Sequence, residues 1–152
     1  MDEEQFRQTQ AALIERSCPF VKGILTQRCH CRQAKKLFIA ERETVYCQNL
    51  MAQQQCEMFF SQLNEKARFA LKIIEVNQPM PHAKKMKLVC GGLFALQELL
   101  SPELESVKIV LDIHELISKT LRHYGDLAQL PWPELVRAIG EYQVRHSSRN
   151  KE

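Results

Sequence analysis

The sequence predicts an all-α protein: a small helical bundle with an irregular, cysteine-rich insert after its first helix. Two observations lead to this fold class. Apolar residues recur at three- and four-residue steps through most of the chain, and no run of alternating apolar residues is long enough to build a sheet. The chain has 152 residues, of which 45% are apolar and 26% charged. This composition is typical of one compact domain, so we expect a single domain over 1–152.

Caps and periodicity predict the first helices. Asp2 and Gln5 stand at capping-box spacing, and a residue before Pro19 is driven away from helical geometry, which together predict a helix over 3–16. Apolar residues at three- and four-residue steps predict a long helix over 52–75. The prolines that follow it cannot lie inside a helix, so they end this element.

Prolines and a glycine also separate the later helices. Ser101 and Pro102 provide an N-cap and a proline at the first helical position, and Gly125 ends the helix that they begin. The expected helices are 82–100, 102–123 and a last one that opens at 131–134 and runs to 142. Two adjacent glycines, Gly91 and Gly92, predict close helix packing or a kink within the first of them.

The segment after the first helix has a different character. Residues 18–47 show no sustained helical period, and we expect loops with one short helix around 33–41 and an extended piece at 44–46. The predicted division of the single domain is a cysteine-rich metal or cluster module over 18–56, a helical bundle core over 57–146 and a frayed tail over 147–152.

The cysteines are the most informative residues. Five of the six lie within residues 18–56, and Cys90 stands apart. In a reducing compartment, clustered cysteines are more often metal ligands or reactive thiols than disulfides. Zinc and iron–sulfur clusters each need about four cysteine sulfurs that converge on one site. The sequence therefore predicts a cysteine-ligated cofactor.

The predicted ligands, of the metal and of the cofactor alike, are Cys18, Cys29, Cys47 and Cys56, with Cys31 as the alternate to Cys29. Cys29 and Cys31 are too close together for both to bind one site easily. The spacing lacks the paired C-x2-C motifs of zinc ribbons and fingers, which favours an iron–sulfur cluster over zinc. Cys47 and Cys56 would lie about 13 Å apart along one helix, so their convergence requires the long helix to begin near residue 52.

Other chemistries receive less support. Cys90 lies in an apolar run and is predicted to be a buried core thiol. A nucleophilic pair of Cys90 with His82 is conceivable, but no orienting third residue is identifiable, so an enzyme is not the favoured interpretation. Gly91 and Gly92 lack the rest of a phosphate-binding motif.

The charge is nearly balanced, with 21 basic and 18 acidic side chains and a net charge of +3. A net charge this small does not by itself indicate a nucleic-acid partner, although basic residues surround the cysteines. The N-terminus lacks a secretory signal and no apolar run is long enough to cross a bilayer, so we expect a cytoplasmic protein without membrane attachment.

Three functions remain open at this point. The leading hypothesis is a small iron–sulfur protein acting in electron transfer, redox sensing or cluster handling, with a protein redox or assembly partner. The first alternative is a zinc-stabilised helical module that binds nucleic acid or an acidic protein. The second is a helical scaffold with inert thiols. The cysteine spacing supports the first, and the ordinary burial of free cysteine supports the last.

Overall fold

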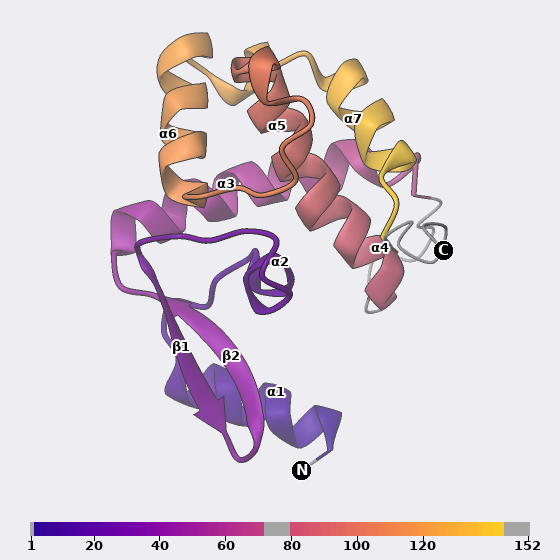
Figure 1. Ribbon diagram of the computed structural model, residues 1–152. Helices are drawn as coiled ribbons and strands as arrows, with labels where there is room; N and C mark the ends of the chain where they lie inside the picture. The colour runs from indigo at the N-terminus through magenta and orange to yellow at the C-terminus, as the bar shows by residue number, and fades with distance from the viewer. Residues whose placement is uncertain (1, 72–79, 145–152) are drawn as a thin grey trace.

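The structure, a computed structural model, describes residues 2–71 and 80–144, and it is not purely helical (Figure 1). Helices account for 60% of it, but strands β1 (Ala34–Ile39) and β2 (Arg42–Cys47) form a two-stranded antiparallel sheet. The expectation of an all-α fold is therefore wrong, and the fold is mixed. The short helix expected over 33–41 is also wrong, because β1 occupies those residues.

Pairing between the two strands explains why the predicted helix over 33–41 is wrong. The β1 sequence Ala-Lys-Lys-Leu-Phe-Ile contains good helix formers, whereas β2 carries Thr44, Val45 and Tyr46, which favour strands. The register pairs Ala34 with Cys47 and Ile39 with Arg42. Ala40 has a positive φ of 57° in the connecting turn, where the sequence offers none of the usual glycine or asparagine signals. Tertiary pairing has overridden local propensity in β1.

The first helix and the hairpin form one lobe (Figure 1). Helix α1 (Glu3–Leu13) ends three residues earlier than expected, and its capping box between Asp2 and Gln5 is confirmed. Phe6 and Ile14 pack with Ile39 of β1 in a small core of their own, separate from the main one. The Phe6 ring also supports the guanidinium of Arg42, which lies 3.9 Å from the ring centre. We call this unit the hairpin lobe.

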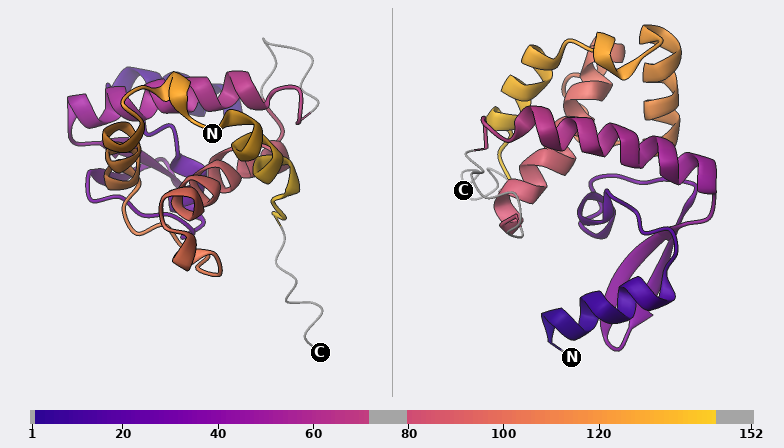
Figure 2. Two further views of the ribbon diagram at one scale, coloured as in Figure 1. Left: turned by 90° about the horizontal axis from the view of Figure 1, so that it is seen from above. Right: turned by 180° about the vertical axis from the view of Figure 1, so that it is seen from behind.

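The helices on either side of the hairpin in sequence, α2 and α3, lie between the hairpin lobe and the later helices (Figure 2). A short helix α2 (Val21–Leu25), which the sequence did not predict, precedes the hairpin. Helix α3 (Leu50–Ala67) begins two residues before the expected start, after the N-cap Asn49. A turn follows over 68–71, so α3 ends earlier than the predicted 52–75 helix, and the part of that prediction over 72–75 lies outside the described residues.

The expected helix over 82–100 is continuous but not uniform. Helix α4 (His82–Met86) passes into a π turn over Lys87–Gly91 and then into α5 (Gly92–Leu100). The glycines have the predicted packing role: a Cβ on Gly92 would lie 2.6 Å from Cδ2 of the buried Leu63, and one on Gly91 would lie 2.9 Å from Cβ of Tyr142. Helix α3 and the chain after α7 therefore approach this backbone closely.

The last third of the chain differs from the prediction of one helix over 102–123. A helix was predicted over 102–123, but only a 3₁₀ turn over Pro102–Leu104 follows Ser101, and α6 (Ile113–Tyr124) begins after an irregular segment. Within the irregular segment, Val110 pairs with the loop before β1 through hydrogen bonds from Val110 N to Arg28 O and from His30 N to Val110 O. Gly125, with φ of 81°, ends α6 as predicted. Helix α7 (Trp132–Glu141) completes the fold, and the predicted tail over 147–152 lies outside the described residues.

The main core joins α2 to the later helices. Phe59 of α3 stacks on Trp132 of α7 at 6.2 Å between ring centres, and Phe20 packs against Phe59 at 6.3 Å. The segment just before α2 is thus anchored in the same core as the C-terminal helix. In the described residues, no helix is long and apolar enough to cross a membrane.

The close approach at Gly92 generates a stability prediction. Gly92→Ala should lower the free energy of unfolding by about 1–3 kcal/mol, because the added Cβ meets a buried leucine that has little room to move. Gly140→Ala is the matched control, since a Cβ added at this position in α7 would have no atom within 4 Å, and it should raise stability by about 0.4–1 kcal/mol. Urea unfolding measures both. Equal effects of the two substitutions would contradict the packing role of Gly92.

Candidate metal centre

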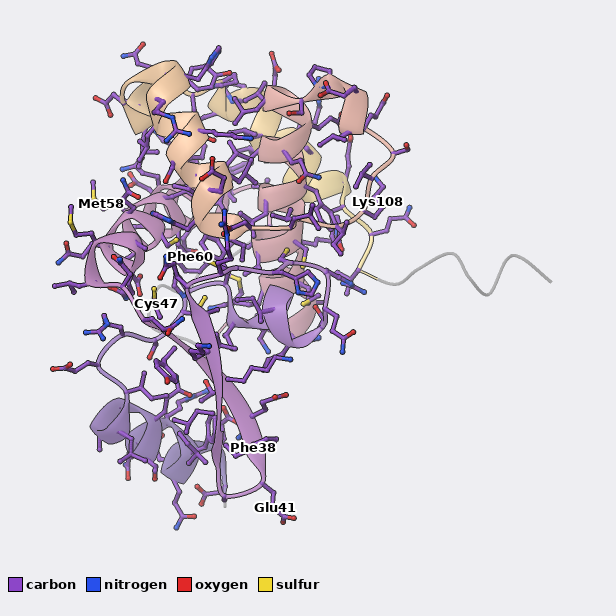
Figure 3. The ribbon with its side chains drawn as sticks, turned by 60° about the vertical axis from the view of Figure 1, so that its left-hand side comes forward. Phe38, Glu41, Cys47, Met58, Phe60 and Lys108 are labelled. Atoms are coloured by element: carbon purple, nitrogen blue, oxygen red, sulfur yellow. The ribbon has the colours of Figure 1, made fainter. Side chains whose placement is uncertain are left out.

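Four of the six cysteines line one cavity between the hairpin lobe and the central helices. They come from four segments: Cys18 from the loop after α1, Cys31 from the turn before β1, Cys47 from the end of β2 and Cys56 from the second turn of α3. Figure 3 shows Cys47 at the end of the hairpin that faces the helices, with further sulfur atoms gathered there. The cavity is thus a meeting point of segments that are distant in sequence.

Backbone pairing places Cys18 beside Cys47. The N–H of Cys18 donates to the carbonyl of Val45 at 3.1 Å, and the N–H of Cys47 donates to the carbonyl of Arg16 at 2.7 Å. The Arg16 side chain adds a hydrogen bond from Nε to the carbonyl of Cys47 at 3.0 Å. Residues 16–18 therefore run antiparallel beside β2, although only an isolated bridge between Ser17 and Tyr46 is formed.

The start of α3 sets the positions of Cys47 and Cys56. Asn49 Oδ1 accepts a hydrogen bond from the N–H of Ala52 at 2.9 Å, which caps the helix. The thiol of Cys47 donates to the carbonyl of Asn49 at 3.2 Å. Residues 45–60 are not one continuous helix, so the condition for bringing Cys47 and Cys56 to one site is met.

The loop that contains Cys31 is held from the other side. His30 is tied to the chain before α6 by two hydrogen bonds, from its N–H to the carbonyl of Val110 and from the N–H of Ile113 to its own carbonyl, both at 2.8 Å. The backbone N–H groups of Gln33 and His114 point at the sulfur of Cys31. This sulfur therefore has two fixed hydrogen-bond donors.

The rest of the cavity wall is apolar or neutral. It includes Pro19, Phe20, Gln33, Ala34, Ala52, Gln53, Ile113 and His114. The empty space is about 310 Å³ when counted out to open solvent, and the interior has room for no more than one water molecule. Among the described residues, no group of three His, Cys, Asp or Glu side chains is close enough to hold a single metal ion. The four sulfurs thus surround a space without meeting at one point.

Burial opposes ionisation of three of these thiols, those of Cys18, Cys31 and Cys56. Burial raises the pKa of Cys18 to about 12, and the thiols of Cys31 and Cys47 add to the rise. Burial is also the main reason why the pKa values of Cys31 and Cys56 are raised. The N–H of Phe20 works in the opposite direction at Cys18, because it stabilises the thiolate. These buried thiols therefore remain protonated near neutral pH unless a cation is bound there.

The remaining two cysteines lie elsewhere. Cys29, one of the four ligands expected from the sequence, does not line the cavity; its side chain interacts with that of Cys90 instead. Its place at the cavity is taken by Cys31, the alternate. Cys90 is fully buried, as predicted for a core thiol. His82 is exposed, and its Nδ1 lies 3.1 Å from Nζ of Lys22.

Sequence reasoning missed two features of this region. The choice between Cys29 and Cys31 depends on the hydrogen bonds that orient the loop, and those bonds go to residues 110–114, far along the chain. The contact between Cys29 and Cys90 has no sequence signal either, because the two residues come from segments whose packing no local pattern reveals. Arg28, which precedes Cys29, donates to Tyr142 Oη at 3.3 Å and to the carbonyl of Val144 at 2.8 Å, and no sequence pattern predicted these bonds.

Comparison with known proteins identifies no relative of this chain. No protein-family model, no curated protein and no solved structure matches the chain significantly.

Proposed function

We propose that the chain is an iron–sulfur protein whose cluster is bound by Cys18, Cys31, Cys47 and Cys56. The observation that carries this proposal is that thiols from four separate segments line one cavity. Free cysteines commonly fill apolar cores, and cysteines buried for that reason alone would have no reason to line the same cavity. The proposed role is electron transfer, redox sensing or cluster handling.

The donor set fits such a cofactor. The four thiolates of an iron–sulfur cluster are shared among two or four irons, so the cysteine sulfurs surround the cluster and need not converge on one point. Zinc, in contrast, requires four ligands about 2.0–2.3 Å from one ion. When bound, a cluster supplies one-electron transfer, and hydrogen bonds to its sulfurs are among the factors that set its potential. In this chain the N–H groups of Phe20, Gln33 and His114 would provide them.

A zinc-stabilised interaction module is the second candidate, because four cysteine sulfurs also suit a structural zinc ion. The hairpin beside the cavity carries exposed Lys35 and Lys36, which could meet an acidic surface. Arg42, however, is paired with Glu3 at 2.8 Å, and Arg32 is paired with Asp112 at 2.9 Å. Two of the basic side chains around the cysteines are therefore already neutralised within the chain, which supports a protein partner over nucleic acid.

The first test identifies the ligands and the metal together. Anaerobically purified protein should be brown and contain iron and acid-labile sulfide, and Cys18→Ser, Cys31→Ser, Cys47→Ser and Cys56→Ser should each lose most of both. Cys29→Ser is the matched control, because it alters a cysteine two residues from Cys31 that faces away from the cavity, and it should retain the cluster. A colourless protein with one zinc per chain would support the second candidate instead. Full retention of metal in the four serine variants would reject both.

The second test removes the metal. Most large side chains of the main core, Phe59 and Trp132 among them, do not line the cavity, so chelation should leave most of the helical circular dichroism intact. Trypsin should then cleave first between residues 16 and 42, where the cavity walls are loop and hairpin. Far-ultraviolet dichroism and limited proteolysis followed together measure this. Complete loss of helix on chelation would show that the metal holds the main core together.

The third test concerns protons. Because burial raises the pKa of Cys18 to about 12 and also raises those of Cys31 and Cys56, metal binding must displace protons from these thiols near neutral pH. Metal affinity should therefore rise as the pH rises from 6 to 8. Calorimetric titration of the metal-free protein in buffers of different ionisation enthalpy measures the number of protons released. Binding that releases no protons would argue against thiol ligation.

A further inference from the structure

The two-stranded sheet has one covered edge and one open edge. On the β2 side, residues 16–18 pair with the strand through the hydrogen bonds from Cys18 N to Val45 O and from Cys47 N to Arg16 O. On the other side, β1 pairs only with β2 among the described residues. The sheet therefore already accepts a short extended segment at one edge, and its other edge has no neighbouring strand.

The register identifies the backbone groups on the open edge. The N–H of Gln48 donates to the carbonyl of Gln33 at 2.8 Å, and successive pairs of an antiparallel ladder alternate between bonded and non-bonded. By this alternation, the β1 residues bonded to β2 are Lys35, Leu37 and Ile39. Lys36 and Phe38 therefore direct their N–H and C=O groups outward, and in the described part of the chain no hydrogen bond reaches these four groups.

The side chains at the open edge are accessible. Helix α1 covers one face of the hairpin, where Ile39 packs with Phe6 and Ile14. Lys36 and Phe38 project from the opposite face, because side chains alternate along a strand. Phe38 is 64% exposed and lies toward the tip of the hairpin, away from the later helices (Figure 3). A strand edge with unpaired backbone groups is a template for pairing with another chain.

The charge of β1 favours an acidic occupant. Lys35 and Lys36 are both exposed, and the strand contains no acidic residue. Neither lysine takes part in an ion pair within 2–71 and 80–144. Opposite charges on neighbouring strands stabilise their pairing, and like charges destabilise it. Pairing of two β1 strands would bring four lysines together without an acidic residue, so a second copy of this chain fits the edge poorly.

The open edge leads to the cysteine cavity. Gln33 precedes β1 and Ala34 begins it, and both residues line the cavity together with Cys31. A strand that lies along β1 therefore ends beside the wall of the cavity to which Cys31 belongs. A partner held at this edge is placed next to the candidate metal centre.

We propose that the open edge of β1 is a docking site for an extended acidic segment of a partner protein, which adds to the hairpin as a further strand. The outward N–H and C=O groups of Lys36 and Phe38 form the main-chain hydrogen bonds. Lys35 and Lys36 bind carboxylates on the two faces of the added strand, and the Phe38 ring provides an apolar contact. The edge is built by the chain itself, so this inference does not depend on the metal proposed for the cavity.

The first test measures the charge preference with the full-length chain. The probe is a fluorescein-labelled peptide of eight residues in which glutamate alternates with valine, and its binding is followed by fluorescence anisotropy. Lys36→Glu should weaken binding roughly threefold to thirtyfold, because a like-charge pair replaces an opposite-charge one. Lys119→Glu is the matched control: it makes the same charge change at an exposed lysine of α6 and should leave the affinity within about twofold of the parent. Equal weakening by the two substitutions would reject the site.

The second test separates strand pairing from simple attraction between charges. With saturating peptide, the amides of Lys36 and Phe38 should exchange with deuterium roughly tenfold more slowly, as measured by nuclear magnetic resonance. The same peptide methylated at every backbone nitrogen keeps its charge but cannot donate hydrogen bonds, and it should bind roughly tenfold more weakly. Equal binding of the methylated peptide, unchanged exchange at both amides, or protection of these amides by self-association of the chain without peptide would each overturn the proposal.

Discussion

The pairing of residues 16–18 with β2 is the interaction on which the rest of the structure depends. Two backbone hydrogen bonds, Cys18 to Val45 and Cys47 to Arg16, join the chain that leaves α1 to the strand that leads into α3. Phe20 follows directly and is buried against Phe59, so the same short segment that positions Cys18 also enters the main core. Without this pairing, Cys18 would lose the two backbone hydrogen bonds that hold its segment beside Cys47.

The sequence predicted those elements whose signals are local. The capping box of α1, the glycine that ends α6 and the proline-rich opening of α7 each depend on residues within one helical turn, and all three are found. The errors fall where distant pairing decides the conformation. Lys35 and Leu37 favour a helix locally, yet they pair with Tyr46 and Thr44 in a sheet. Val110 has a helical period with its neighbours but pairs with the Cys29 loop instead.

The candidate site, too, was predictable only as far as local sequence signals indicate it. The clustering of cysteines along the chain indicated three of the four cavity residues, because any fold that makes residues 18–56 compact brings Cys18, Cys47 and Cys56 near one another. The choice of Cys31 over Cys29 was not predictable, since both lie in the same loop and differ only in which side of it they face. That side is set by hydrogen bonds from His30 to Val110 and from Ile113 to His30.

The surroundings of a cysteine strongly change the pKa of its thiol in this protein. Burial raises the pKa of Cys18 to about 12, whereas the Cys29 thiol, with Arg28 and Tyr142, lowers the pKa of Cys90 to about 7 despite its burial. A single loop thus contributes Cys31 to the cavity and Cys29 to the main core, where the two thiols have different surroundings.

The separate small core of the hairpin lobe has a consequence for which part of the molecule can open locally. Phe6, Ile14 and Ile39 are the buried residues of that core, and each contributes about 1.5–3 kcal/mol, much less together than the main core that holds α3 and α6. Detaching the lobe therefore costs less free energy than unfolding the domain. Val45 keeps the cavity end of β2 in the main core, so the part of the lobe that can open at low cost is α1 with the far end of the hairpin.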